Sequence, residues 1–407
     1  MPSRYAHLSR NRLADLVLHL QLAGHLIDRS AIPQTMHAVS RKELIDIIID
    51  EDVAATPIYH KRLQRALKFE SDDVTTFFKG IQLEILAPPQ YMDFEFIVHG
   101  PRDAEFILRS CGSLLDFEPI GEGFVRAMCH DVEDPTFDGT AIATNPRMQC
   151  RPIHRPPRVP ADREPHCHWT VKVDDAYPAV SVHPNQLVLE AHHVANLVLD
   201  EIDPADEGAS DYSGPLVDNV DYHAFSRSAL IRLVDEMCIQ MHLLNQSWRI
   251  AMAPRTTKET LHDIAVKSLI GHAAVTAERI HKVLGLPSTL EAAADVLELH
   301  PIFNPFGYVN LTRDGVRLRI TKSIAHDDEA WICLVGPHSV GPLQAAVRAV
   351  DPHFDVEVAG TDTDWSLEVV RRAIPAKEDP NVSLVRASNA TAFQFKQRKS
   401  LPLTVIK

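Results

Sequence analysis

The chain has 407 residues, 45% of them hydrophobic and 24% charged, which is the composition of a globular protein with more than one domain. Its net charge of −14 argues against a nucleic-acid partner, because phosphate binding needs a basic surface. Six cysteines without regular spacing indicate free thiols in a reducing compartment. No signal-peptide block or long apolar run is present, so we expect a cytoplasmic protein that does not enter a membrane.

The first third of the chain predicts three helices followed by a β-hairpin. Apolar residues recur at helical spacing in each helix, and Pro33 is expected to end or kink the first. Ser40 and Glu43 form a capping-box pattern at the start of the second, which we expect to break near Pro57. The expected bounds are 9–32, 40–69 and 71–85 for the helices and 92–114 for the hairpin.

The sequence contains an internal repeat. Residues 8–67 align without a gap on 225–284, so that Leu8 falls on Phe225, and we call this alignment the repeat register. The matches are mostly apolar and keep the helical period, which is typical of two copies of one helical unit. They include Leu13/Leu230, Leu16/Leu233, Val17/Val234, His25/His242, Leu26/Leu243, Ser30/Ser247, Ile47/Ile264, Arg62/Arg279 and Leu67/Leu284.

Three further matches follow with gaps. Segment 106–111 aligns on 330–333, segment 134–138 on 351–355, and segment 168–173 on 364–369. In this alignment the first copy carries one insertion, 145–165, that the second copy lacks. The second copy keeps the apolar scaffold and the tryptophan but not the reactive residues of the first. One functional copy and one scaffold copy are therefore expected.

These patterns predict an α+β fold made by duplication of a unit in which a helical bundle is followed by a small antiparallel sheet. The expected parts are a first α+β repeat at 1–178 with the Cys/His/Arg cluster, an acidic connector at 179–222, a scaffold-like second repeat at 223–376 and a C-terminal tail at 377–407. Within the connector we expect a helix at 187–202 and a loop at 203–221, and the tail is expected to end in a strand at 403–406.

The stretch 111–169 of this histidine-rich chain holds four of the six cysteines and combines thiols, imidazoles, carboxylates and guanidiniums. Cys111, Cys129 and Cys167 are expected on a strand, a helix and a later strand, which can meet in one pocket. A thiolate there would be a nucleophile or a metal ligand. For each cysteine taken singly, packing as a small apolar group is the alternative. Cys129 and Cys111 are the candidate catalytic thiols.

His130, Asp131 and Glu133 follow one of these cysteines. On a helix, His130 and Glu133 lie on one face, an arrangement that suits an acid–base pair or two metal ligands. We assign His130 as the candidate general base and Asp131 as the residue that orients it. Asp134 and Phe137 have matches in the second copy and are expected to be structural.

A metal site is the second hypothesis for the same stretch. On a strand, His166 and His168 point to one face and Cys167 to the other, so the two histidines supply half of a site. Cys167 and these histidines are not expected to serve one pocket. The candidate ligands for zinc or iron are His166, His168, Glu133 and Cys167.

The proline-rich insertion is basic in an otherwise acidic chain. Arg147, Arg151, His154 and Arg155 are the candidate substrate-binding residues, because guanidinium groups bind carboxylates and phosphates with two hydrogen bonds. A substrate carboxylate is preferred, and a nucleotide or coenzyme A phosphate is the alternative ligand. A solvated loop or a partner-docking arm explains the same residues equally well.

Other motifs carry less weight. Glu190/His193 and Glu278/His281 have the Glu-x-x-His spacing of di-metal carboxylate bundles, but the repeat does not make them equivalent. The chain has no glycine-rich dinucleotide or phosphate loop, no Gly-x-Ser-x-Gly and no His-Glu-x-x-His. Nicotinamide enzymes, P-loop enzymes and α/β-type serine hydrolases therefore lose support.

Over residues 40–175 the chain resembles the L-2-amino-thiazoline-4-carboxylic acid hydrolase family. The likeness follows a helical lead-in and consists of Cys-Gly-x-Leu from Cys111 to Leu114, Cys-x-Asp from Cys129 to Asp131, and a cysteine before an aromatic residue from Cys167 to Trp169. The resemblance implies hydrolysis of a cyclic C–N or C–S bond in a small carboxylate-bearing molecule.

Three functions stay open from the sequence. The first is a hydrolase of a small anionic substrate, with Cys129 or Cys111 as nucleophile or ligand and Arg151 or Arg155 as the carboxylate clamp. The second is a zinc or iron enzyme of another reaction class. The third is a non-catalytic scaffold. A homo-oligomer is compatible with each of them.

Overall fold

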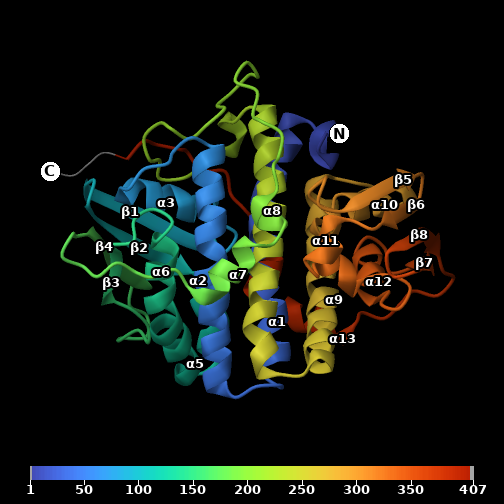
Figure 1. The fold of residues 1–407 in the computed structure, drawn as a ribbon, viewed down its shortest axis with the longest axis horizontal. Coiled ribbons are helices and arrows are strands. Elements are labelled where there is room, and N and C mark those ends of the chain that lie inside the picture. Colours follow the sequence, from blue (N-terminus) through green and yellow to red (C-terminus); the bar gives the residue numbers. More distant parts are fainter. Residues whose placement is uncertain (1, 404–407) are drawn as a thin grey trace.

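The computed structural model describes residues 2–403. It is an α+β protein with two four-stranded antiparallel sheets, and the predicted fold class is confirmed (Figure 1). The strand predicted at 403–406 extends outside the described residues. Within residues 2–403, no helix combines the length and the apolar character that crossing a membrane requires.

Four long helices lie at the centre of the molecule (Figure 1). Each begins after a Ser or Thr whose side chain accepts a hydrogen bond from a backbone N–H of the first turn, so these caps set where the helices start. The helices of the second copy begin and end at the positions that the repeat register assigns to those of the first. They are α1 (Arg10–Thr35), α2 (Arg41–Ala66), α8 (Arg227–Met252) and α9 (Lys258–Val283).

A four-stranded sheet flanks the central helices on each side (Figure 1). The strand orders are β1-β2-β4-β3 and β5-β6-β8-β7, the same topology twice. Trp169 pairs with Phe106 on the second strand of one sheet, and Trp365 pairs with Ile320 on the second strand of the other. The strands are β1 (Met92–Gly100), β2 (Asp103–Cys111), β3 (Met148–His154), β4 (Cys167–Val173), β5 (Asn310–Asp314), β6 (Arg317–Thr321), β7 (Phe354–Gly360) and β8 (Asp364–Arg371).

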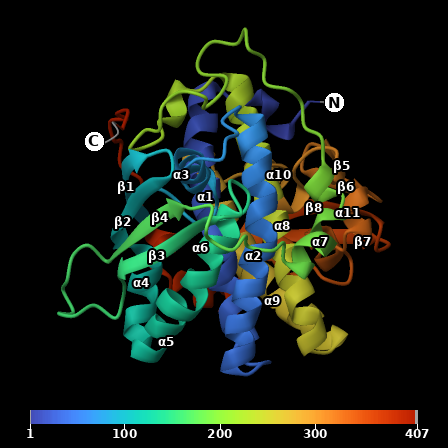
Figure 2. The ribbon, with the colours of Figure 1, turned by 60° about the vertical axis from the view of Figure 1, so that its left-hand side comes forward.

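Shorter helices connect these elements in the same order in both copies. One precedes each sheet, and others lie between the second and third strands, as Figure 2 shows for the first copy. In the first copy, part of this connection is a π-helical segment, η3, a form that often marks functional sites. The helices are α3 (Val74–Leu83), α4 (Gly112–Phe117), α5 (Glu122–Arg126), η3 (Ala127–Val132), α6 (Glu133–Ala141), α10 (Leu290–Glu298), α11 (Ile324–Asp327) and α12 (Gly341–Arg348).

Two prolines lie inside helices where the sequence suggested an end or a break. Pro33 is in the last turn of α1, and Pro57 is buried in the middle of α2. Proline removes one backbone hydrogen bond and crowds the preceding turn. Because α2 packs on both α6 and α8, tertiary contacts hold the helix together across Pro57.

Two of the gapped alignments were wrong. Segment 106–111 lies on β2, whereas 330–333 overlaps a 3-10 helix at Trp331–Leu334. Asp134 lies within α6, whereas Asp351 and Pro352 lie in the turn before β7, which begins at Phe354. The structural counterpart of Pro352 is Pro146, which lies in the turn before β3. Short Asp-Pro matches are poor guides to register, because this pair occurs at many turns and helix starts. The basis for treating Asp134 and its neighbours as scaffold is therefore removed.

The size difference between the copies is also not a single insertion at 145–165. The loop between β3 and β4, 155–166, is much longer than the turn 361–363 of the second copy. In addition, β1 and β2 are longer than β5 and β6. The long loop borders the pocket described below.

Several contacts between the copies come in pairs related by an approximate two-fold axis. In each pair, a residue of the first copy bonds a residue of the second, and their counterparts in the repeat register make the matching contact. The same patch is thus used on both sides, as in the interface of a symmetric dimer. The pairs are Arg10 with Phe225 and Arg227 with Leu8, Ser30 with Ser268 and Ser247 with Glu51, and Arg62 with Glu236 and Arg279 with His19.

Each copy ends in an arm that crosses to the other copy. The backbone N–H of Asn389 donates to Asp116 of the first copy at 2.9 Å, and that of His193 donates to Asp328 of the second copy at 2.9 Å. The two aspartates each also accept a tyrosine hydroxyl. The arms are built on α7 (Pro184–Glu190) and α13 (Pro380–Arg386).

The connector and the tail are thus equivalent arms rather than spacers. The helix expected at 187–202 begins earlier and ends at Glu190, before a short 3-10 turn at Val194–Asn196. Segment 203–221 contains no helix or strand, as expected. The helix α13 was not expected, because seven residues are too short to show a clear period.

One hydrophobic core joins the two copies. A single cluster of buried residues contains Leu16 and Leu63 of the first copy together with Leu233 and Leu269 of the second. A second cluster lies under the first sheet and includes Val275 of α9 and Val385 of α13. The predicted repeats at 1–178 and 223–376 therefore share their interior.

Candidate functional site

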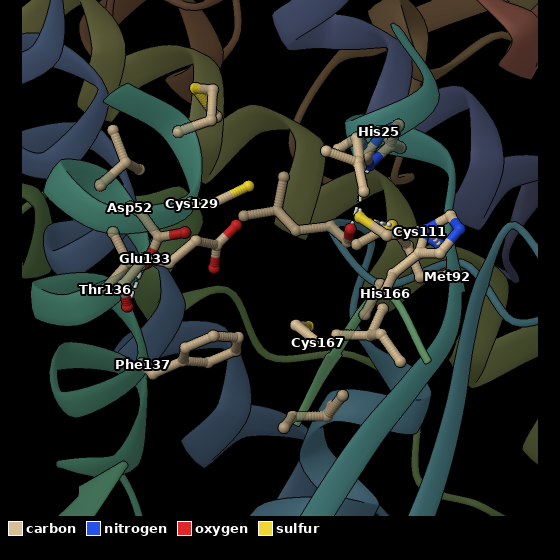
Figure 3. Close-up of a pocket in the computed structure, with 18 of the residues that line it drawn as sticks. His25, Asp52, Met92, Cys111, Cys129, Glu133, Thr136, Phe137, His166 and Cys167 are labelled. Atoms are coloured by element: carbon tan, nitrogen blue, oxygen red, sulfur yellow. Dashed lines mark hydrogen bonds between the residues drawn. The ribbon is translucent and has the colours of Figure 1, made fainter. Parts of the chain in front are cut away.

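A cavity of about 120 Å³ lies in the first copy between α1, α2, the segment η3 with α6, and the first sheet (Figure 3). We call it the thiol pocket, because the side chains of Cys111, Cys129 and Cys167 line it. All three are free cysteines. Its lining also includes Glu133 of α6 and His166, so residues distant in the sequence meet here.

The three thiols come from three elements, as the sequence predicted. Cys111 ends β2 and caps α4, since the backbone N–H of Leu114 donates to its Sγ at 3.4 Å. Cys129 lies on η3, and Cys167 is the first residue of β4. His166 Nδ1 accepts the backbone N–H of Cys111 at 2.9 Å, which ties the loop 155–166 to β2.

The thiols are protonated at neutral pH. Burial raises the pKa of Cys111 to about 12, and it also raises the pKa values of Cys129 and Cys167. For Cys129, the charges of Cys111 and Glu133 raise the pKa further. A reactive thiolate therefore has to be formed by proton transfer to a base, because the surroundings do not stabilise its charge.

Half-buried carboxyl groups also line the pocket, and Glu133 and Asp52 lie near Cys129 (Figure 3). Burial, followed by the charges of Glu84 and Asp134, raises the pKa of Glu133 to about 7. Burial raises the pKa of Asp28 to about 6 against the opposing effect of Arg29. Groups that titrate near neutral pH in a pocket suit acid–base chemistry.

Asp52 of α2 lies next to Glu133 in the pocket. Burial raises its pKa well above the usual range, and the charges of Glu84 and Glu133 add to the shift. The hydroxyls of Thr56 and Thr140 each lie 3.5 Å from Asp52 Oδ1. Burial thus favours the protonated form of Asp52, which lies within a small hydrogen-bonded group.

His25 lines the pocket, and His60 contacts Glu84, another residue of the lining. His60 Nε2 lies 2.7 Å from Glu84 Oε2 in a buried pair. His25 Nδ1 contacts the carbonyl of Leu86 at 3.0 Å, and its Nε2 lies 3.2 Å from Arg29. Burial and the Arg29 charge lower the pKa of His25 to about 3, so its ring stays neutral.

Sequence reasoning missed Asp28, Asp52 and the residues packed on them. A usable signal was present in the repeat. In the repeat register, Asp28 falls on Asn245 and Asp52 on Leu269. A carboxyl group on a buried helix face, where the other copy has a neutral residue, marks a position that packing alone does not explain.

The second copy fills the corresponding space. His242, the counterpart of His25, lies 4.9 Å from the indole of Trp331 between ring centroids, and His272 lies 5.2 Å from the same indole. Trp331 is 2% exposed. His25 borders the thiol pocket instead.

No family model, no curated protein and no solved structure matches the chain. The chemistry of the thiol pocket therefore rests on its own residues.

His130 and Asp131 do not line the pocket. His130 Nε2 contacts the carbonyl of Pro156 at 2.7 Å, and Asp131 is exposed. A π-helical turn holds more residues than an α-helical turn, so His130 and Glu133, three residues apart, do not share a face. Glu133, unlike His130, lines the pocket together with Cys129.

The four predicted metal ligands do not form one cluster. His168 Nε2 lies 2.5 Å from Glu105 Oε2 on β2, away from the pocket. His166 and Cys167 both line the pocket, because His166 precedes β4 and the strand alternation does not apply to it. Across residues 2–403, no three His, Cys, Asp or Glu side chains are close enough together to hold a metal ion.

Of the four predicted substrate-binding residues, only Arg155 lines the pocket. It pairs with Asp134, and its guanidinium lies 5.8 Å from the ring centroid of Trp169. The other three bond within the fold: Arg147 to the carbonyls of Asp175 and Tyr177, Arg151 to Asp138, and His154 to the carbonyl of Pro165.

Phe137 is part of the pocket rather than of the scaffold alone. It lines the cavity and packs edge-on against Trp169, with 5.0 Å between ring centroids. The Glu-x-x-His tetrads, in contrast, lie elsewhere. Glu278 pairs with Lys282 and Arg386, and His193 pairs with Asp328.

Proposed function

We propose that the first copy hydrolyses a C–N or C–S bond of a small carboxylate-bearing molecule, the reaction that its resemblance to the L-2-amino-thiazoline-4-carboxylic acid hydrolases implies. One observation supports this most: Cys129 lines the same pocket as Glu133, whose pKa is about 7. A thiol and a carboxylate that can accept its proton supply the nucleophile and the general base that nucleophilic catalysis needs.

In the proposed reaction Glu133 takes the proton of the Cys129 thiol as its sulfur attacks the substrate carbon. A new S–C bond forms, and the C–N or C–S bond of the substrate breaks. The leaving nitrogen or sulfur receives the proton from Glu133. Water, deprotonated by Glu133, then displaces the Cys129 sulfur, which recovers its proton. Asp52, whose pKa burial raises, would in its protonated form donate a hydrogen bond to negative charge on the substrate.

Arg155 is the proposed carboxylate clamp. It lines the pocket and is already held by Asp134 and by the face of Trp169. A substrate carboxylate can approach the remaining guanidinium N–H groups without reorganising the side chain.

The decisive experiment compares Cys129→Ser with the wild type on 2-aminothiazoline-4-carboxylate and related cyclic carboxylates. We expect Cys129→Ser and Glu133→Gln each to lower kcat at least about 100-fold, because nucleophile and base act in every turnover. Cys333→Ser is the matched control, since that cysteine is exposed and outside the pocket. Full turnover by a folded Cys129→Ser protein rules out the proposed nucleophile.

We propose the cytoplasm as the working compartment. All six cysteines are free, which fits a reducing environment.

A further inference from the structure

A second cavity of about 300 Å³ adjoins the thiol pocket. The two cavities share Asp28, Arg29, Ile48 and Met128 as a common wall. We call the second one the apolar pocket, because side chains without charge form most of its surface. These include Ile32, Met36, Leu44, Phe117, Ile120 and Phe124.

The second copy has a cavity of about 320 Å³ at the corresponding place, but its lining is charged. Arg249 takes the place of Ile32 in the repeat register. Glu329 replaces Phe117, since each directly follows the aspartate that binds the opposite arm. Arg249 and Glu329 form an ion pair at 2.9 Å. The fold thus accepts a polar lining here, and the apolar lining is particular to the functional copy.

The common wall is suited to a ligand that extends through it. Arg29 presents no free charge to the apolar pocket, because it pairs with Asp116 at 3.1 Å and lies 5.0 Å from the ring of Phe117. Met128 belongs to η3 and has three rotatable side-chain bonds, so it can change rotamer without moving the backbone. The neighbouring Cys129 faces the thiol pocket.

We propose that the substrate is amphiphilic: its reacting polar group occupies the thiol pocket, and an attached alkyl or aryl group occupies the apolar pocket. This inference rests on the proposed function for the identity of the reacting end. At about 120 Å³ the thiol pocket holds only a compact group, and the adjoining 300 Å³ brings the combined site into the usual range of ligand pockets. A neutral tail fits most of this lining, because Arg29 is paired with Asp116. The exposed Arg41 donates to the carbonyl of Gly123, and its guanidinium lies 5.3 Å from the ring centroid of Phe124.

The test uses N-alkylmaleimides with ethyl, butyl, hexyl and octyl tails on the full-length protein with Cys333→Ser. Mass spectrometry identifies the labelled cysteine. Each labelling rate is divided by the rate at which the same maleimide reacts with glutathione, which corrects for the intrinsic reactivity of the reagent. We expect the rate at Cys129 to rise up to about fourfold per methylene until the pocket is full, because each buried methylene contributes that factor. The double variant Ile32→Arg/Phe117→Glu should remove the dependence of the Cys129 labelling rate on tail length. Arg249→Ile/Glu329→Phe, the reverse exchange in the second copy, should leave it unchanged.

Equilibrium binding of the neutral dye N-phenyl-1-naphthylamine separates this inference from the thiol chemistry. We expect Ile32→Arg/Phe117→Glu to lose dye binding. If that double variant does not fold, Ala387→Trp at the edge of the pocket takes its place. Loss of dye binding in either variant supports the apolar site even if Cys129 is unreactive. An inert Cys129 counts against the proposed nucleophile only. Dye binding that survives both lining changes, or a rate at Cys129 independent of tail length, overturns the amphiphilic substrate.

Discussion

Burial and the charges of Glu84 and Asp134 raise the pKa of Glu133 from its ordinary value of 4.5 to about 7. Between these pH values the folded protein holds a proton that the unfolded chain has released. The free energy of unfolding therefore falls as pH rises from about 4.5 to 7. In the proposed reaction, attack needs the ionised form of Glu133, so we expect activity to rise with pH through about 7.

This linkage predicts the pH dependence of Glu133→Gln. A glutamine has no proton to lose, so the stability difference between variant and wild type should grow in favour of the variant from pH 5 to pH 8. The full growth is at most about 3 kcal/mol, since one pKa unit corresponds to about 1.4 kcal/mol. Urea unfolding at four pH values measures it. Glu122→Gln on the exposed side of α5 is the control, and parallel pH curves for Glu133→Gln and wild type would contradict the raised pKa.

At the same scale, the sequence identified Cys111, Cys129, Cys167, Glu133 and Arg155, all of which line the thiol pocket. These residues were predicted because thiol, carboxylate and guanidinium side chains are chemically reactive or bind charged ligands. It did not identify Asp28 or Asp52, because a carboxylate on a helix is normally a surface residue and only burial makes it unusual. His130 was chosen on α-helical spacing, which the π-helical turn changes.

The junction of β2 and α4 positions Cys111 through a close approach of two backbones. The N–H of Gly112 donates to the carbonyl of Tyr91 at 2.9 Å, and a Cβ at Gly112 would lie 2.2 Å from the Tyr91 ring. That ring packs on His25 and its hydroxyl donates to Asp116. A side chain at position 112 must therefore push against two parts of the site.

We expect Gly112→Ala to destabilise the protein by about 1–3 kcal/mol, the usual cost of overpacking. Gly100→Ala, at the end of β1, should change stability by less than about 0.5 kcal/mol, since no atom lies within 4 Å of the added Cβ. Thermal and urea unfolding compare the two. Equal stability of both variants would mean that Tyr91 moves without cost.

Helix starts and the hairpin were predictable because caps and periodicity are local features. Ser40 with Glu43 forms the capping box that the sequence indicated. The expected break at Pro57 was wrong, because packing on both faces of α2 outweighs one lost hydrogen bond. The crossing arm built on α13 was not predicted, since its partners lie in the other copy.

At the scale of the whole molecule, paired contacts and crossing arms give the chain the organisation of a symmetric dimer joined into one polypeptide. Ser388 and Leu384, from the second copy's arm, line the apolar pocket of the first copy. Arg62 pairs with the buried Glu236 across the interface at 2.9 Å. Each copy therefore completes the interior and the pocket surroundings of the other.

This organisation predicts that the two halves stay together when the connector is cut. A protease site inserted after the exposed Glu201 should give, after cleavage, a complex of both fragments that elutes at the size of the intact chain. The shared core and the two arms hold it together. Separation of the fragments in buffer without denaturant would contradict a shared core.

The sequence by itself determined the α+β class, the duplication and the difference between the copies, because apolar periodicity, caps and reactive residue types are readable along one chain. The tertiary structure alone decided which reactive residues meet. Burial, which no local pattern records, turns Glu133 into a base near neutral pH and keeps the thiols protonated. Arg151 and His168 do not reach the site in the folded protein, because Arg151 pairs with Asp138 and His168 pairs with Glu105.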